Sequence, residues 1–256
     1  MSYLSSPTPK MPAGYRLLKL DTVDSTNAEA KRRAEMGEPG PLWIWSARQS
    51  KGRGRAGREW TSQVGNLFAS LLIRPHCTLQ TASQLALVAG IAAYDTLAKL
   101  VAYEGRADLL LKWPNDVLLA EEKVAGILLE NVGSAKGSGS VVVIGTGMNL
   151  ANHPPNLPQP AISLAAYGLQ VSPGDALQVL ASTTHEWIMR WGEEQRSRPS
   201  AGRGSIALVL GRPLRVSLSG EQIEGTYAGL DADGALRLRT AEGERHITAG
   251  DVFFAS

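Results

Sequence analysis

The chain has 256 residues, 43% of them hydrophobic, which is enough for one sizeable α/β domain and a small second unit. Its 26 Lys and Arg against 24 Asp and Glu leave a formal net charge of +2, so no global field would draw it onto nucleic acid or anionic lipid. Its single cysteine, Cys77, excludes an internal disulfide, and the four histidines lack metal-ligand spacing. We therefore expect a cytoplasmic protein, since the sequence also has neither a signal-peptide pattern nor a run of ~20 apolar residues.

Three segments are predicted to be helices. Residues 1–20 are expected to be a flexible tail, and the first helix follows where Thr26 and Glu29 have the spacing of a capping box and Gly37 offers a stop. A second helix is expected over about residues 83–101, and a third begins at Ser172 with proline at its first position. The apolar residues expected on their buried faces are Leu87, Ile91, Tyr94, Leu97 and Val101 in the second and Leu177, Leu180, Trp187, Ile188 and Trp191 in the third.

Short apolar runs between the helices predict the strands of a mixed sheet. These runs cover residues 42–47, 66–73, 108–113, 116–120, 123–130 and 141–145. The segment 195–205 is rich in Gly, Ser, Pro and Arg and has no periodicity, which is typical of a linker. Beyond it short strands alternate with turn residues. We therefore expect a main domain over residues 21–205 and a small β-barrel over residues 206–256.

The strongest chemical signal is a basic, glycine-rich segment over residues 48–60, here named the basic loop. Its glycines let backbone N–H groups approach an anion, and the guanidinium groups of Arg53 and Arg55 are forked donors suited to phosphate or carboxylate. The segment is not a Walker A loop, because it lacks the Gly-Lys-Ser/Thr sequence. Ordering about ten residues costs on the order of 10 kcal/mol, so we expect the loop to be mobile until several charge-assisted hydrogen bonds to one small anion form. Composition alone equally allows a solvated loop or a nucleic-acid contact.

Two lysines stand beside apolar strands. Lys112 ends one predicted strand just before the turn formers Asn115 and Asp116, and Lys123 begins another strand. By spacing alone both could be surface lysines, but a lysine that enters the core of a sheet needs an anionic partner. We therefore expect this strand end to border a site. The glycine pattern at 145–147 also ends a buried strand, where it leaves space for a ligand or forms a plain turn.

Five motifs, in this order, resemble the biotin protein ligases (biotin-[acetyl-CoA-carboxylase] ligases). They are DSTN at 24–27, GRGRAGREW at 52–60, KWPNDVL at 112–118, KVAGILLE at 123–130 and GTGMN at 145–149. The resemblance spans residues 24–149, with a further match onward to the C-terminus. It implies an α+β fold with a mixed β-sheet and helices on one face, as in class II aminoacyl-tRNA synthetase-like and biotin-lipoyl ligase catalytic domains, followed by a small SH3-like β-barrel.

The resemblance also implies residue roles. Lys123, Arg55 and Arg53 would be catalytic. The biotin-binding residues would be Ser25, Thr26, Asn27, Gln49, Gly52, Arg53, Gly54, Arg55, Lys123, Gly126, Leu128, Gly145 and Gly147, with the residues at 25–27 on the ureido head. The ATP-binding residues would be Arg53, Arg58, Trp60, Lys112, Asn115, Asp116 and Asn149.

The reaction that the resemblance implies needs ATP with Mg²⁺, and biotin as substrate. The biotin carboxylate attacks the α-phosphorus of ATP and pyrophosphate leaves, while fixed cations and backbone donors stabilise the phosphoryl charge. An ordered loop would shield the resulting biotinyl-5'-AMP from water until a lysine of a biotin carboxyl carrier domain attacks its carbonyl. Neither an enzyme nucleophile nor a dedicated protein cage for a metal is expected.

Two alternatives remain open from the sequence. A lipoate or octanoate ligase or transferase would share the catalytic fold, although the basic loop and the KWPND motif argue against it. A nucleic-acid-binding module without catalytic activity could use the basic loop and the barrel, although the near-balanced charge disfavours it. Family members that also repress transcription carry a winged helix-turn-helix before the DSTN motif, and only about twenty residues precede it here. We expect no nucleic-acid or membrane partner, and either a monomer or a homodimer.

Overall fold

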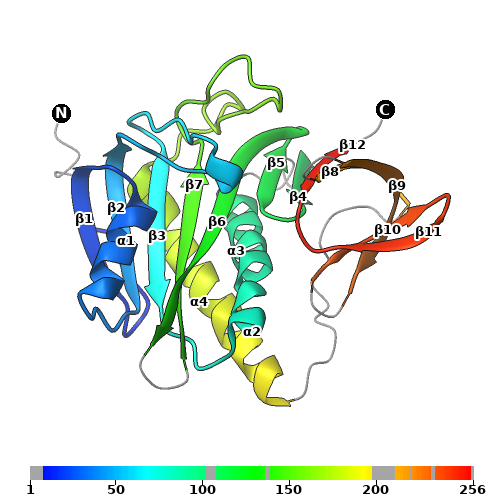
Figure 1. Cartoon of the computed structure of the whole chain (residues 1–256). Helices are drawn as coiled ribbons and strands as arrows, with labels where there is room; N and C mark the ends of the chain where they lie inside the picture. The colour runs from blue at the N-terminus through cyan, green and yellow to red at the C-terminus, as the bar shows by residue number, and fades with distance from the viewer. Residues whose placement is uncertain are drawn as a thin grey trace.

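The computed structural model describes residues 8–101, 108–135, 139–197, 211–218, 221–231 and 234–254. A seven-stranded mixed sheet flanked by helices forms the larger part, and a smaller five-stranded antiparallel sheet lies at the C-terminal end (Figure 1). Both sheets agree with the predicted α+β fold.

The large sheet has the strand order β1-β2-β3-β7-β6-β5-β4. Its strands are β1 (Arg16–Val23), β2 (Leu42–Gln49), β3 (Leu67–Ile73), β4 (Leu109–Lys112), β5 (Asp116–Leu119), β6 (Glu122–Ala135) and β7 (Gly139–Met148). Only β1 and β2 pair in parallel, and the other neighbours are antiparallel. The helices are α1 (Thr26–Glu35), α2 (Leu79–Ser83), α3 (Leu85–Leu100) and α4 (Pro173–Ser197).

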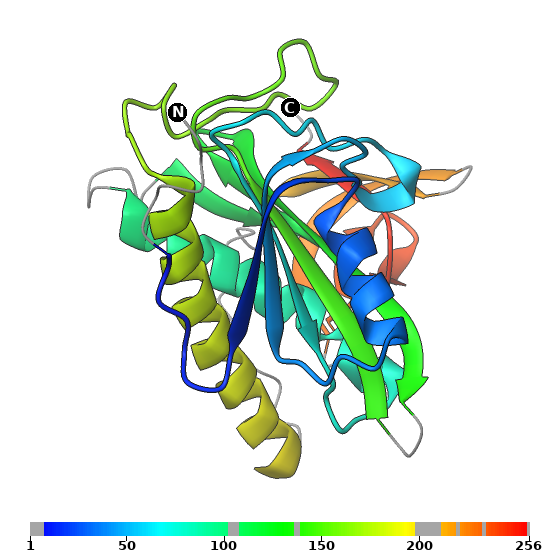
Figure 2. The same cartoon turned by 90° about the vertical axis from the view of Figure 1, so that its left-hand side faces the viewer.

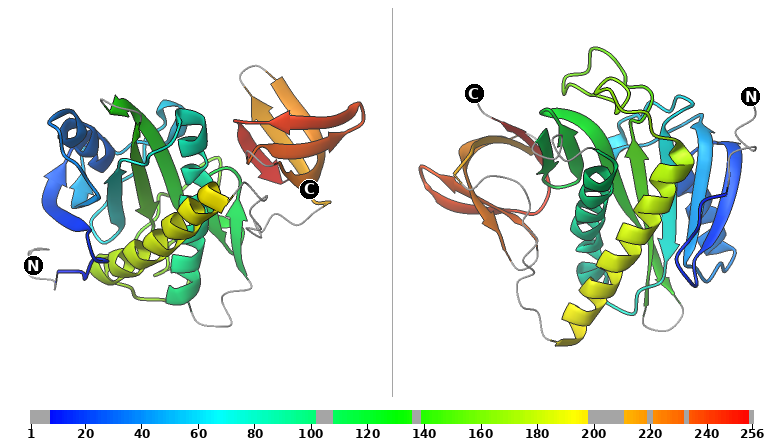
Figure 3. Two further views of the ribbon diagram at one scale, coloured as in Figure 1. Left: turned by 90° about the horizontal axis from the view of Figure 1, so that it is seen from below. Right: turned by 180° about the vertical axis from the view of Figure 1, so that it is seen from behind.

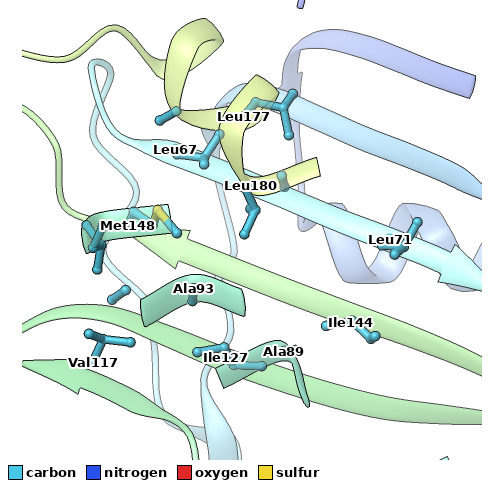
Figure 4. Close-up of a cluster of buried hydrophobic side chains, with 14 of the residues drawn as sticks. Leu67, Leu71, Ala89, Ala93, Val117, Ile127, Ile144, Met148, Leu177 and Leu180 are labelled. Atoms are coloured by element: carbon cyan, nitrogen blue, oxygen red, sulfur yellow. The ribbon is translucent and has the colours of Figure 1, made fainter. Parts of the chain in front are cut away.

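Both faces of the large sheet carry helices, because alternate residues of each strand point to opposite sides. In β2, Trp43 and Trp45 belong to the main core, which α2, α3 and α4 cover. Leu71, Ile144 and Leu180 lie in the same core (Figure 4). Ile44 belongs instead to a second cluster with Ala30 and Ala34 of α1. The expected single helical face is therefore correct for α2, α3 and α4, whereas α1 lies on the opposite side (Figure 2).

Alanines set the buried face of α3. Ala89, Ala92 and Ala93 are almost fully buried, which lets α3 pack closely on the sheet and on α4 (Figure 3). In the predicted apolar stripe Leu97 and Val101 are buried, but the side chains at positions 87, 91 and 94 are only half-buried. The predicted helix corresponds to α3, which begins at Leu85, and the short α2, which ends at Ser83, precedes it.

The helix caps agree only in part with those predicted from the sequence. In α4 the Ser172 hydroxyl accepts a hydrogen bond from the Asp175 N–H, as expected of an N-cap. The capping box predicted for α1 is wrong, because its N-cap is Ser25 without a side-chain cap and Glu29 pairs with Arg32 and Arg33. The predicted stop is confirmed: Gly37 follows the helix with φ +88°.

The C-terminal sheet has the order β11-β10-β9-β8-β12. Its strands are β8 (Pro213–Leu218), β9 (Glu221–Leu230), β10 (Leu236–Thr240), β11 (Gly243–Ile247) and β12 (Asp251–Phe254). Its apolar core includes Leu214, Leu236 and Val252, and Trp113 of the main domain packs into the same cluster. The Trp113 indole N–H also donates to the Gly234 carbonyl at 3.1 Å, so the two domains are joined beside the turn after β4.

The chain segments at the domain ends differ from the prediction. The flexible tail expected over residues 1–20 is wrong from Arg16 onward, because β1 begins there. The predicted linker at 195–205 is helical up to Ser197, the end of α4. Residues 1–7 and the rest of that linker lie outside the described residues. Within the described part of the chain, no helix has the length and apolar character needed to cross a membrane.

Candidate active site

Strand register brings the sequence motifs together on the α1 side of the large sheet. Residues paired across neighbouring strands share a face, so one row crosses six strands. From β2 to β4 this row is Ser46, Phe68, Gly147, Gly126, Asp116 and Lys112. The next row, from β2 to β6, is Ile44, Ser70, Gly145 and Leu128. The lysine and glycine motifs therefore meet without being close in sequence, and Asn27 of the DSTN motif packs against Gly145.

A cavity of about 280 Å³ lies over these rows. Of the residues predicted to bind ligand, the structure brings together on its wall Ser25, Thr26, Asn27, Gln49, Arg53, Gly54, Arg55, Arg58, Trp60, Lys112, Asn115, Asp116, Lys123, Gly126, Leu128, Gly145, Gly147 and Asn149. Gly52 is the exception. A Cβ at Gly52 would lie 2.3 Å from the Trp60 carbonyl oxygen, so this glycine is required by close backbone packing within the basic loop.

The strand glycines make room for protein side chains. A Cβ at Gly147 would lie 2.5 Å from the Trp60 ring, and one at Gly126 would lie 2.8 Å from the same ring. A Cβ at Gly145 would lie 2.2 Å from Asn27 Oδ1. The predicted space beside these glycines exists, but Trp60 and Asn27 occupy it and themselves face the cavity.

A neutral polar network forms one end of the cavity. The Ser70 hydroxyl lies 2.6 Å from Asn27 Oδ1 and 2.7 Å from Thr26 Oγ1, and Ser70 is fully buried. Gln49 Oε1 accepts from the Thr26 backbone N–H at 2.8 Å, which caps α1 from a different strand. Because these amides and hydroxyls hold one another, their donors and acceptors are fixed in direction before any ligand arrives.

The buried Lys112, the half-buried Lys123 and one carboxylate form the other end. Lys123 Nζ lies 2.7 Å from Asp116 Oδ1 and 5.3 Å from the centre of the Trp60 ring. Lys112 is 6% exposed, with its Nζ 5.2 Å from the Phe253 ring. Burial lowers the pKa of Lys112 from its ordinary value, and the nearby Asp116 acts in the opposite direction. The anionic partner predicted for Lys123 is thus Asp116, and Lys112 is a second cation beside this pair.

The basic loop contacts both domains. Arg55 Nη1 donates to Asn115 Oδ1 at 2.8 Å and Nη2 donates to the Gly250 carbonyl at 3.1 Å. Arg58 forms an ion pair with Asp251 at 2.8 Å. Burial lowers the pKa of Arg55, whereas the carboxylates at positions 251 and 116 raise it. These contacts place loop guanidinium groups between the cavity and the C-terminal sheet.

Sequence reasoning missed two segments that line the cavity. One is the proline-rich stretch around Pro154, Pro158 and Ala161, and the other is Asp251 to Phe253 of β12. The first follows the GTGMN motif directly, and its prolines were the only signal that a shaped loop begins there. The second has no signal in sequence, because its place depends on how the two domains pack.

Oxygen atoms of the kind that bind metal ions line the cavity. Asp116 and Asp251 supply carboxylates, and Asn115 and Asn149 supply amide oxygens. Among the described residues, no group of three or more His, Cys, Asp or Glu side chains could hold a metal ion. One or two carboxylates near amide oxygens fit Mg²⁺ that shares its ligands with phosphate and water, which is its usual mode beside nucleotides.

Comparison with known proteins agrees with this geometry. Residues 20–149 match the model of the biotin/lipoate A/B protein ligase family, and residues 209–255 match that of the biotin protein ligase C terminal domain. The chain therefore belongs to the biotin/lipoate A/B protein ligase family.

Individual relatives narrow the comparison to biotin ligases. The chain is 38% identical to a biotin--[acetyl-CoA-carboxylase] ligase of Paracoccus denitrificans, over 92% of this chain and 99% of the relative. It is 32% identical to the enzyme of the same name from Mycobacterium tuberculosis, over 94% and 90%. The solved biotin protein ligase from Aquifex aeolicus in complex with biotin and ATP is similar with a TM-score of 0.72 and 28% identity, covering 94% of this chain and 98% of that chain.

Proposed function

We propose that this protein is an ATP-dependent biotin ligase. It activates biotin to biotinyl-5'-AMP and transfers the biotinyl group to a lysine of a biotin carboxyl carrier domain of acetyl-CoA carboxylase or a related carboxylase. The observation that carries the proposal is one cavity with a neutral polar network around Asn27 at one end and Lys112 and Lys123 at the other. Biotin has this polarity, since a planar ureido head is joined through an apolar chain to a carboxylate.

The ureido head binds at the start of α1. Thr26, Asn27 and Gln49 present hydroxyl and amide groups there, and Ser25 lies beside them on the cavity wall. A site built to pair the donors and acceptors of its ligand rejects ligands that leave them unpaired. This end therefore favours biotin over lipoate or octanoate, which have no ureido group.

The end of the cavity with the lysines and arginines binds the two reacting groups, the biotin carboxylate and the α-phosphoryl group of ATP. Lys123 and the forked donors Arg53 and Arg55 hold the biotin carboxylate and the α-phosphoryl oxygens, with Gly54 allowing backbone approach. Negative charge develops on the phosphoryl group as the carboxylate oxygen bonds to phosphorus and pyrophosphate leaves. Fixed cations in a water-poor cavity stabilise that charge without reorganising. Lys123, whose Nζ lies 2.7 Å from Asp116 Oδ1, acts by electrostatics and need not transfer a proton.

The nucleotide binds between the turn after β4 and the basic loop. Arg58, Trp60, Lys112, Asn115, Asp116 and Asn149 line this side of the cavity. Mg²⁺ bound with ATP would neutralise phosphate charge, and Asp116 and Asp251 are carboxylates on the cavity wall that would hold it. Lys112 then gains the anionic neighbour that its burial calls for.

The proposal also covers the domain organisation and the protein partner. The catalytic domain begins with β1 at Arg16 and extends to residue 205, and residues 206–256 form the SH3-like domain. The partner is the carrier domain, met in the cytoplasm by a monomer or homodimer that binds neither nucleic acid nor membrane. The carrier lysine amine attacks the biotinyl carbonyl, and AMP leaves.

The direct test is incubation with MgATP, radiolabelled biotin and an isolated carboxylase carrier domain. Covalent label on the carrier, absent without ATP and absent when the carrier lysine is replaced by arginine, supports the proposal. A parallel incubation with labelled lipoate or octanoate and a lipoyl domain tests the related chemistry. Transfer of those acids in place of biotin would refute the assignment.

A further inference from the structure

A carboxylate just outside the cavity holds three groups, two from α1 and one from the basic loop. Glu130 lies on β6, two residues beyond Leu128, and is not among the residues that line the cavity. Its Oε2 accepts from Asn27 Nδ2 at 2.9 Å, and its Oε1 accepts from Lys31 Nζ at 2.6 Å. Arg53 Nη2 of the basic loop lies 2.7 and 2.5 Å from its two oxygens.

The electrostatic balance favours an ionised Glu130. Burial raises the pKa of this carboxyl, but the hydrogen bonds from Lys31 and Asn27 and the charge of Arg53 outweigh burial, so the net pKa lies below its ordinary value. Its side chain is 19% exposed, against 42% for Arg53. An ion pair between exposed groups is worth little, but a charge-assisted bond to a mostly buried carboxylate with several donors is stronger.

We propose that Glu130 is a positioning residue that holds the basic loop, through Arg53, against the same Asn27 amide that faces the ligand cavity. Asn27 Nδ2 is bound by Glu130 and by the Leu128 carbonyl, so its Oδ1 must point toward Ser70 and the cavity. Arg53 is bound to the carboxylate that fixes this amide. The loop is thereby partly ordered before ligand binds, and the entropy lost when it closes is smaller.

The inference rests on the proposed function for its ligand, but its first test needs no ligand. Trypsin cleaves after Lys and Arg, and the basic loop contains Lys51, Arg53, Arg55 and Arg58. In the ligand-free full-length protein, Glu130→Gln keeps a hydrogen-bond acceptor for Asn27 but removes the charge. We expect its loop to be cut about five to ten times faster than in the parent, as loss of one partly exposed charge-assisted bond would give.

The matched control is Lys31→Met, which removes the other cation on Glu130 but belongs to α1. Its loop cleavage should equal that of the parent. Equal acceleration in Glu130→Gln and Lys31→Met would show that Glu130 acts only by holding α1, and would overturn the proposal. Unchanged cleavage in Glu130→Gln would do the same.

A second variant changes the exposed partner of the contact, Arg53. It keeps the proposal testable if Glu130→Gln fails to fold. Arg53→Gln should accelerate cleavage at the remaining loop sites, and the double variant with Glu130→Gln should be no more sensitive than either single variant. Additive effects would mean that the two residues stabilise the loop independently, contrary to the proposal.

The steady-state rates then link the contact to catalysis. Glu130→Gln should raise the KM for biotin about tenfold, as for one charge-assisted bond, and leave kcat at saturating biotin unchanged. A fall in kcat with an unchanged KM is the pattern of a structural defect and would overturn the positioning role. If the parent protein shows no biotin binding, the proposed function fails, while the trypsin comparison still decides whether Glu130 holds the loop.

Discussion

Arg55 Nη1 lies 2.8 Å from Asn115 Oδ1, so a guanidinium of the basic loop is bonded to the turn that follows β4. The other amide atom of Asn115, Nδ2, donates to the Ile127 carbonyl at 2.6 Å, which fixes the orientation of the amide. Arg55 is therefore held by a rigid acceptor on the sheet and by the Gly250 carbonyl of the C-terminal domain. The Arg55 side chain therefore connects the basic loop to both domains at their junction.

Replacing Arg55 by glycine should let the activated intermediate escape. Arg55→Gly removes both loop contacts and adds backbone freedom, so the closed loop becomes less populated. We expect biotin activation to continue and labelling of lysines on an added bystander protein to rise about tenfold or more, as for the loss of about two hydrogen bonds. Mass spectrometry of the bystander measures this. Arg245→Gly, at an exposed strand position remote from the cavity, is the control, and equal bystander labelling by the two variants would contradict the prediction.

Replacing Lys123 by alanine should slow formation of the adenylate. Lys123→Ala removes the cation beside Asp116 and leaves that carboxylate facing the substrate anions without a partner. Loss of one preorganised charge-stabilising donor typically costs about 10² to 10³ in rate. Release of pyrophosphate before carrier is added measures the step. Lys99→Ala is a matched control, because Lys99 is half-exposed and 3.8 Å from Glu186 on the opposite side of the sheet; a Lys123→Ala protein as fast as this control would remove Lys123 from the mechanism.

A single methyl group at Gly147 should disrupt the cavity. The Cβ of Gly147→Ala would lie 2.5 Å from the ring of Trp60, so the indole must move. Overpacking of this kind costs about 1–3 kcal/mol, and we expect the KM for ATP to rise about tenfold or more. Gly192→Ala is the control. The site in α4 has open space around a Cβ, and alanine there should stabilise the helix by about 0.5–1 kcal/mol without a change in rate. A Gly147→Ala enzyme with the parent KM would show that Trp60 is not fixed by this strand.

The motifs could be predicted to form one site because each stands at a strand end or helix start with its own local signal. Gly37, Ser172 and Lys112 lie in the structure where the sequence places a helix stop, a cap and a site border. The mixed sheet follows from the same apolar runs. Local chemistry was sufficient wherever the relevant partner lies within a few residues.

The errors arose where a distant partner decided the outcome. The first N–H of α1 is capped by Gln49, 23 residues away, so the predicted capping box was not formed. The carbonyl of Gly250 that binds Arg55 lies 195 residues further along the chain. Gly52 has the composition of a ligand-binding glycine but is required by the Trp60 carbonyl. The triple contact at Glu130 likewise depends on strand pairing that the sequence does not reveal.

Through Asp24 of the DSTN motif, the free energy of unfolding should also depend on pH in the acidic range. The hydrogen bond from Arg32 lowers the pKa of Asp24 to about 2, from an ordinary value of 3.8, although burial acts in the opposite direction. Because the pKa is lower in the folded state, the carboxylate contributes its full stability above 3.8, and the contribution is lost as the pH falls toward 2.

Asp24→Asn should therefore lower the free energy of unfolding at neutral pH, and the difference from the parent should shrink to zero near pH 2. Asp24 is partly exposed, so we expect a difference of about 0–1 kcal/mol, the range of surface ion pairs. Urea unfolding of both proteins across this pH range measures it. Arg32→Met should remove the same pH-dependent part, and Asp24→Asn should have no further pH effect in that background. A difference that persists unchanged to the lowest pH would mean that the Asp24 charge is not what stabilises the start of α1.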